Sequence, residues 1–112
     1  SAVPAFLSYL QVERRMSAHT LDAYQRDLAA LSQWCQAHGI DDPQALAADQ
    51  LREFIAAEHR RGLAAKSLQR RLSACRSFYA WLLKNNVIDR VNAGVIFLRD
   101  VALNEDGTRN VL

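Results

Sequence analysis

Glycine and proline are scarce in this chain of 112 residues, which has four of the first and two of the second. That scarcity excludes collagen-like and low-complexity disordered chains. β-Branched residues are also sparse before residue 87, whereas Ala and Leu are abundant, and this bias favours helix. The length suits one compact domain with its own core.

Long apolar runs are missing as well. None approaches the ~20 residues that a membrane-spanning helix needs, so we expect no membrane partner. The N-terminus shows no secretory signal pattern. These features together predict a cytoplasmic protein.

Cysteine and histidine are few, and their positions indicate neither a disulfide nor a metal site. Cys35 and Cys75 each fall on the apolar side of a predicted helix, which indicates two reduced thiols in a core. The three histidines have no metal-like spacing with each other or with the cysteines. We find no Gly-rich phosphate loop, no paired carboxylates on one face and no nucleophile with a plausible base. We therefore expect a binding module with no catalytic residue, metal, cofactor or small-molecule substrate.

Acidic residues are absent from residues 59–88, although half of the chain's fourteen Lys and Arg residues fall there. These cations are Arg60, Arg61, Lys66, Arg70, Arg71, Arg76 and Lys84. Because the net charge of the whole chain is only +2, positive charge is concentrated on one segment. Such a concentration is typical of a protein that binds a polyanion.

Apolar residues at helical spacing predict an all-α fold. Four helices are expected over about residues 4–15, 18–37, 50–61 and 65–85, with a short helical turn over residues 44–47. Ser17 and Asp49 are candidate N-caps, and Gly39 and Gly62 are candidate stops. We expect one domain over residues 1–88, followed by an irregular or short-strand tail or linker over residues 89–112.

On a helical wheel, the helix over residues 65–85 places its cations away from its apolar stripe. The outer face carries Lys66, Arg70, Ser73 and Ser77, with Ala74 beside them; Ser67 and Arg71 lie on one flank, and Gln69 and Arg76 on the other. An ordinary solvated helix mixes both signs of charge in i,i+4 pairs, whereas here we expect that no acid pairs with any of these cations. Cations and hydroxyls in this arrangement can reach phosphates, and Arg or Gln can reach base edges. The pattern favours nucleic-acid binding over a merely solvated face.

The sequence from residue 6 to residue 88 resembles the N-terminal core-binding domain of tyrosine site-specific recombinases, most closely the XerC branch of the bacterial Xer type. The resemblance rests on Ser17-x-x-Thr20-x-x-x-Tyr24 and on the segment Arg71-Leu72-Ser73-Ala74-x-Arg76-Ser77-Phe78-Tyr79, which occur in this order. It implies a SAM-like orthogonal bundle of four helices that covers one face of duplex DNA. In that family a separate C-terminal domain supplies every catalytic residue, so none is carried onto this chain. After Arg90 the sequence lacks the family's Asn-Pro linker.

The resemblance also implies which residues contact DNA, since the family's contacts come largely from the second and fourth helices. On the matching positions these are Ser17, His19, Thr20, Tyr24, Arg26, Lys66, Ser67, Arg70, Arg71, Ser73 and Arg76. Tyr24 falls on the apolar stripe, and Ser17 and Thr20 also suit helix capping. The implied partners are duplex DNA and a second recombinase of the same family, as in chromosome dimer resolution.

Two other functions stay open at this point. The basic face can dock an acidic protein, in which case the chain is an interaction bundle. The helix after Gly62 can instead serve as the recognition helix of a helix-turn-helix regulator, although it is long for that role. If the recombinase hypothesis holds, we expect charge reversal of Arg70 and Arg71 to abolish duplex binding while the helices stay intact.

Overall fold

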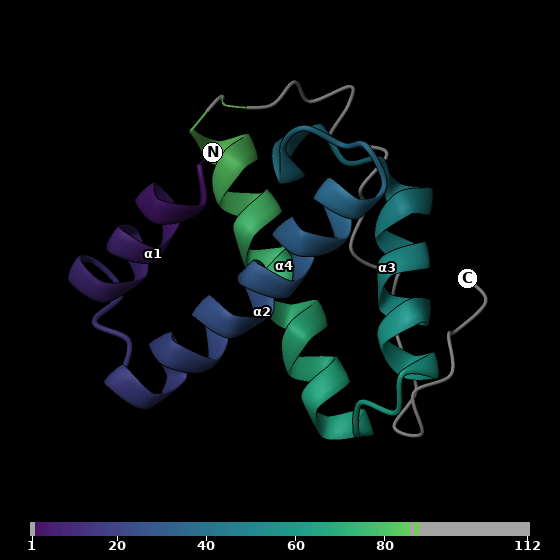
Figure 1. Ribbon diagram of the computed structural model, residues 1–112. Coiled ribbons are helices and arrows are strands. Elements are labelled where there is room, and N and C mark those ends of the chain that lie inside the picture. Colours follow the sequence, from purple (N-terminus) through teal and green to yellow (C-terminus); the bar gives the residue numbers. More distant parts are fainter. Residues whose placement is uncertain (1, 86, 88–112) are drawn as a thin grey trace.

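A computed structural model describes residues 2–85 and 87, and Figure 1 shows its arrangement. The elements are α1 (Val3–Val12), α2 (Ala18–Ala37), the 3-10 turn η1 (Pro43–Ala45), α3 (Ala48–Arg60) and α4 (Ala65–Lys84). No strand occurs within this described part, and the predicted all-α bundle of four helices is confirmed. The tail expected over residues 89–112 lies outside the described residues.

Helix α1 ends three residues before the position expected from the sequence. Pro4 stands in its first turn, where a missing amide hydrogen costs nothing, and Phe6 and Leu10 are buried. The helix stops because Arg15 adopts a left-handed conformation with φ of 50°. The Met16 amide then donates to the Leu10 carbonyl at 3.0 Å, which closes the end of the helix.

Helix α2 has the predicted bounds because both of its ends carry strong local signals. The Ser17 hydroxyl accepts from the Thr20 amide at 3.2 Å, as an N-cap does. Gly39 has φ of 72°, a conformation that glycine adopts without steric cost. The buried face of α2 consists of Ala23, Asp27, Leu28, Leu31 and Cys35, so it includes one carboxylate.

The start of α3 differs from the prediction. The 3-10 turn begins at Pro43, where the Asp42 side chain accepts from the Gln44 amide at 3.1 Å. Helix α3 begins at Ala48, and its N-cap is Ala47 rather than Asp49, which lies in the first turn. The Gln50 side chain reaches back to accept from the Ala47 amide at 2.9 Å, which replaces the expected aspartate cap.

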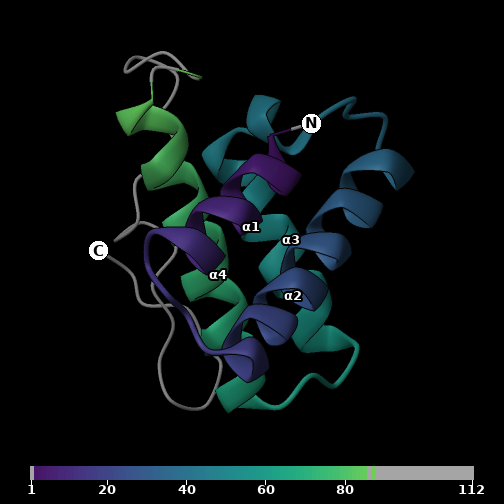
Figure 2. The ribbon, with the colours of Figure 1, turned by 90° about the vertical axis from the view of Figure 1, so that its left-hand side faces the viewer.

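Helix α4 is the central element of the bundle, because it packs against α1, α2 and α3. Figures 1 and 2 show α2 crossing α4, with α1 covering one side of the pair. Seven residues of α4 are buried: Leu68, Leu72, Ala74, Cys75, Phe78, Tyr79 and Leu82. Ala74, expected beside the outer face, is fully buried, so the outward surface of α4 is narrower than the wheel predicted.

The core is closed by aromatic side chains and two thiols. Phe6 packs on Phe78 with ring centroids 5.4 Å apart, and Trp81 packs on Phe6 at 5.6 Å. Cys35 and Cys75 are buried and free, as the sequence predicts. Burial raises the pKa of the Cys75 thiol to about 12, so it stays protonated at neutral pH.

None of the helices in the described part of the chain has the length and apolarity that crossing a bilayer demands.

Candidate nucleic-acid interface

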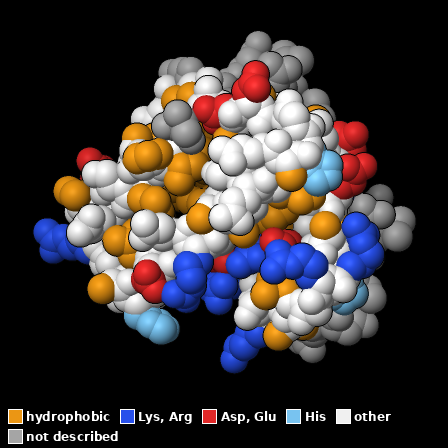
Figure 3. All heavy atoms as spheres, in the orientation of Figure 1, with side chains coloured by type: hydrophobic (Ala, Val, Ile, Leu, Met, Phe, Trp, Pro, Cys, Tyr) orange, Lys and Arg blue, Asp and Glu red, His pale blue; other side chains and the backbone are white. Residues whose placement is uncertain are grey.

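None of the residues expected to contact DNA is fully buried, but the side chain of Arg71 is only 11% exposed and Nε of Arg76 is buried. Ser17, His19, Arg26, Lys66 and Ser73 are exposed, and the remaining positions, Thr20, Tyr24, Ser67, Arg70, Arg71 and Arg76, are partly exposed. Figure 3 shows Lys and Arg side chains gathered in a band across one face of the molecule, below the crossing of α2 and α4, with carboxylates between them. Among the predicted cations, Arg70 and Arg71 are brought together at one carboxylate, that of Asp27.

On α2 the polar residues mostly contact one another. The Ser17 hydroxyl donates to the Thr20 hydroxyl at 2.9 Å, so both groups serve in capping. Arg26 pairs with Asp22, which lies one turn earlier. Both side chains are largely exposed to solvent, at 60% for Arg26 and 63% for Asp22. A pair this exposed contributes little to stability and is screened by salt, which leaves Arg26 available to another anion.

Arg70 on α4 is held by a buried carboxylate of α2. Its Nε donates to Asp27 Oδ2 at 2.9 Å and its Nη2 donates to Asp27 Oδ1 at 2.8 Å. The Asp27 side chain is fully buried, whereas that of Arg70 is 35% exposed. These hydrogen bonds raise the pKa of Arg70 above its ordinary value; the guanidinium is protonated at neutral pH in any case, and here it lies against the buried negative charge of Asp27.

Arg71 is more deeply engaged than Arg70. Its Nε donates to Asp27 Oδ1 at 3.0 Å, and its Nη1 donates to Glu58 Oε1 at 2.9 Å. The Arg71 side chain is only 11% exposed. Glu58 on α3 also accepts from the exposed Arg61 at 2.7 Å. Arg71 therefore joins α2, α3 and α4, and little of its guanidinium is left to reach a ligand.

The expectation that no acid pairs with the cations of α4 is wrong. The carboxylates come from other helices, 43 residues away for Asp27 and 13 for Glu58, so a search along α4 cannot find them. A signal was nevertheless present. Asp27 stands one helical turn from Ala23 and from Leu31, within an apolar stripe, and an acid in such a place must find a partner when it is buried.

Lys66 differs from Arg70 and Arg71 because it points to solvent. It is exposed, and no carboxylate of residues 2–85 pairs with it. Lys66, Arg70 and Ser73 follow one another at spacings of four and three residues, so they share one side of α4. We name these three residues the basic surface of α4.

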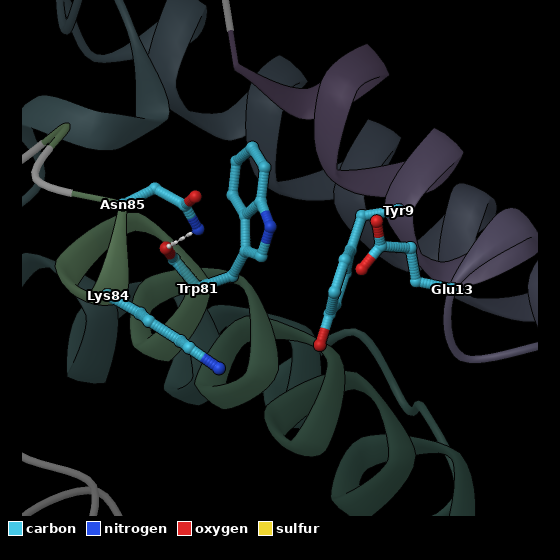
Figure 4. Close-up of a pocket in the computed structure, with 5 residues that line it drawn as sticks. All are labelled: Tyr9, Glu13, Trp81, Lys84 and Asn85. Carbon is cyan, nitrogen blue, oxygen red and sulfur yellow. Dashed lines mark hydrogen bonds between the residues drawn. The ribbon is translucent and has the colours of Figure 1, made fainter.

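A hollow of about 290 Å³ lies at the other end of α4, away from the basic surface. Tyr9 of α1 and Glu13, which follows that helix, face Trp81, Lys84 and Asn85 across it (Figure 4). The Tyr9 and Trp81 rings are 6.1 Å apart between centroids, so they contact each other and leave no slot for a stacked base. Within the described residues, no cluster of His, Cys, Asp or Glu is arranged to hold a metal ion.

Comparison with known proteins gives one consistent result. The family model described as "Phage integrase, N-terminal SAM-like domain" matches residues 3–86. The tyrosine recombinase XerC of Xanthomonas campestris pv. campestris (strain B100) is 66% identical over 79% of this chain and 27% of its own length. The XerC of Xanthomonas axonopodis pv. citri (strain 306) is 58% identical over 86% of this chain and 35% of its own.

The XerC of Xylella fastidiosa (strain 9a5c) is 60% identical over 77% of this chain and 29% of its own length. The chain thus spans about a third or less of these curated relatives. No solved structure was found to match it. The resemblance to a Xer-type N-terminal domain is confirmed, and the chain belongs to the phage integrase N-terminal SAM-like domain family.

Proposed function

We propose that this chain is the DNA-binding half-clamp of a tyrosine site-specific recombinase and covers one face of duplex DNA. The observation that carries the proposal is the basic surface of α4, where Lys66 and Ser73 are exposed beside the partly exposed side chain of Arg70. The family match and the similarity to XerC recombinases support it.

The N-terminal end of α4 adds a second attraction for phosphate. Its N-cap is Ala64, which has no side chain that could accept from the first amides. Those amides carry the positive end of the helix dipole, which favours an anion placed there. Lys66 lies in the same first turn, so a phosphate group can meet both.

The reaction itself belongs to the whole protein. By the family resemblance, a separate catalytic domain breaks and rejoins DNA with a tyrosine nucleophile, and this chain contributes binding alone. We further propose that the parent protein acts in the cytoplasm with a second recombinase of the same family, as in chromosome dimer resolution.

A matched pair of charge reversals tests the proposal. Lys66→Glu alters the basic surface, whereas Lys84→Glu makes the same change at the other end of α4, beside the hollow. Fluorescence anisotropy with a labelled duplex at low salt should show at least about tenfold weaker binding for Lys66→Glu. A lost phosphate contact and a new like charge each cost on the order of 1 kcal/mol. Lys84→Glu should bind almost as the unaltered chain does.

Circular dichroism should show equal helix content in both variants, since neither lysine is buried. Equal affinity of the two variants for duplex DNA would contradict the proposal. Tight binding to an acidic protein without competition by duplex would instead favour an interaction bundle.

A further inference from the structure

Asp27 is the most deeply buried charged group among the described residues. Its side chain has no solvent exposure, and it accepts three hydrogen bonds, two from Arg70 and one from Arg71. Burying a carboxylate costs free energy that its partners only partly return, and a well-packed apolar residue often serves stability as well. A role beyond stability would explain a carboxylate at this place.

The contact between Asp27 and Arg70 has a directional geometry. Both oxygens of the carboxylate bind one edge of the guanidinium, through Nε at 2.9 Å and Nη2 at 2.8 Å. This side-on pairing fixes the plane of the group and leaves the Nη1 end of the fork for another acceptor. The Arg70 side chain is 35% exposed, so part of it meets solvent.

We propose that Asp27 is a positioning residue: it holds the guanidinium of Arg70 in advance in the orientation that binds a phosphodiester group of the DNA backbone. This inference rests on the proposed function, since it needs the basic surface of α4 to bind duplex DNA. An arginine that is already ordered loses less side-chain entropy when it binds, and this raises affinity. Arg71 and Glu58 keep Asp27 in place, because Arg71 binds both carboxylates.

The duplex affinity of an Asp27→Asn variant tests the inference, because a simple charge effect and a positioning effect change that affinity in opposite directions. Asp27→Asn removes a negative charge close to the basic surface, so simple electrostatics predicts tighter binding to DNA. Positioning predicts weaker binding, because the asparagine amide presents only one acceptor to the edge of Arg70. We expect a loss of roughly three- to tenfold, the gain that ordering one such side chain in advance provides.

The experiment measures duplex affinity by anisotropy for the 112-residue chain, with Asp27→Asn beside Asp41→Asn as the matched control. Asp41 is exposed and precedes η1, so its variant makes the same change of net charge without touching the pairing of Asp27 with Arg70 and Arg71. The control should bind as the unaltered chain does or slightly more tightly. Equal or tighter binding by Asp27→Asn, while Lys66→Glu still weakens binding, would overturn the inference and leave the proposed function standing. Loss of the Lys66→Glu effect would instead remove the proposed function.

A double substitution separates positioning from a general structural effect. If Asp27 acts through Arg70, Asp27→Asn should weaken binding no further in an Arg70→Ala background. An undiminished effect in that background would contradict the inference.

A measurement on the unaltered chain covers the case in which Asp27→Asn does not fold. The Nε–H nuclear magnetic resonance signal of Arg70 should be resolved and slow to exchange with solvent, and it should stay so when duplex is added. The exposed Arg60 at the end of α3 serves as the reference for a solvated arginine outside the candidate contacts. An Arg70 signal that exchanges as fast as that of Arg60, or that loses its protection on DNA, would overturn the proposal.

Discussion

Arg71 of α4 donates to Glu58 of α3 at 2.9 Å, and both side chains are nearly removed from solvent, at 11% and 5% exposure. The same arginine also binds Asp27 of α2. One side chain therefore connects three of the four helices. Part of the positive charge of residues 59–88 is therefore paired with carboxylates inside the bundle and does not face a ligand.

Arg71→Ala should destabilise the fold strongly. The substitution leaves two buried carboxylates without a shared partner, and breaking a buried pair in this way costs about 3–5 kcal/mol. A domain of this kind has a total stability of about 5–15 kcal/mol, so the loss is a large fraction of it. Urea unfolding followed by circular dichroism measures the change.

The control is Arg60→Ala, since Arg60 is exposed at the end of α3. We expect its unfolding free energy to change by no more than about 0.5 kcal/mol. Equal stability of the two variants would show that the Arg71 pairings contribute nothing to the free energy of unfolding.

We also expect Arg71→Glu to lose helix content, because it would place a third acid beside Asp27 and Glu58. This differs from the expectation from sequence that the helices stay intact.

Alkaline pH should destabilise the protein through its buried thiols. Burial raises the pKa of Cys75 from 9.0 to about 12, and that of Cys35 from 9.0 to about 11. The unfolded chain thus releases these protons at a lower pH than the folded chain does. The two protonated thiols therefore contribute to the free energy of unfolding, and this contribution is fully present below pH 9. It is lost as pH rises toward 11 for Cys35 and toward 12 for Cys75, at roughly 1 kcal/mol per pH unit for each thiol.

Urea midpoints measured on either side of pH 9 test this dependence, with Cys75→Ala as the comparison. The variant should be less stable below pH 9, because it leaves a small cavity, but its stability should fall less steeply above pH 9, so that the two curves converge. Parallel curves for the two proteins would mean that Cys75 ionises as readily in the folded chain as in the unfolded one.

Local signals made much of the fold predictable. The capping hydroxyl of Ser17 and the glycine at position 39 give α2 its correct bounds, and Gly62, with φ of 95°, separates α3 from α4 as expected. The end of α1 was missed because Arg15, which is not a glycine, takes the left-handed conformation there. The start of α3 was missed because a glutamine side chain, rather than Asp49, satisfies the first amide.

The candidate site was predictable only in part. Spacing along α4 is enough to place Lys66, Arg70 and Ser73 on one side. It does not show how far each cation is buried, because that depends on the neighbouring helices. The pairing of Arg70 and Arg71 with Asp27 spans more than forty residues of sequence, and only the packing of α2 on α4 creates it.

The salt dependence of duplex binding tests the central claim most directly. The logarithm of the association constant should fall linearly with the logarithm of salt concentration, with a slope of about −0.9 for each phosphate neutralised. Lys66→Ala removes one of these contacts and should make the slope shallower by about one, whereas Lys84→Ala should leave it unchanged. The same slope for Lys66→Ala as for the unaltered chain would contradict the account, because it would show that the basic surface of α4 neutralises no phosphate.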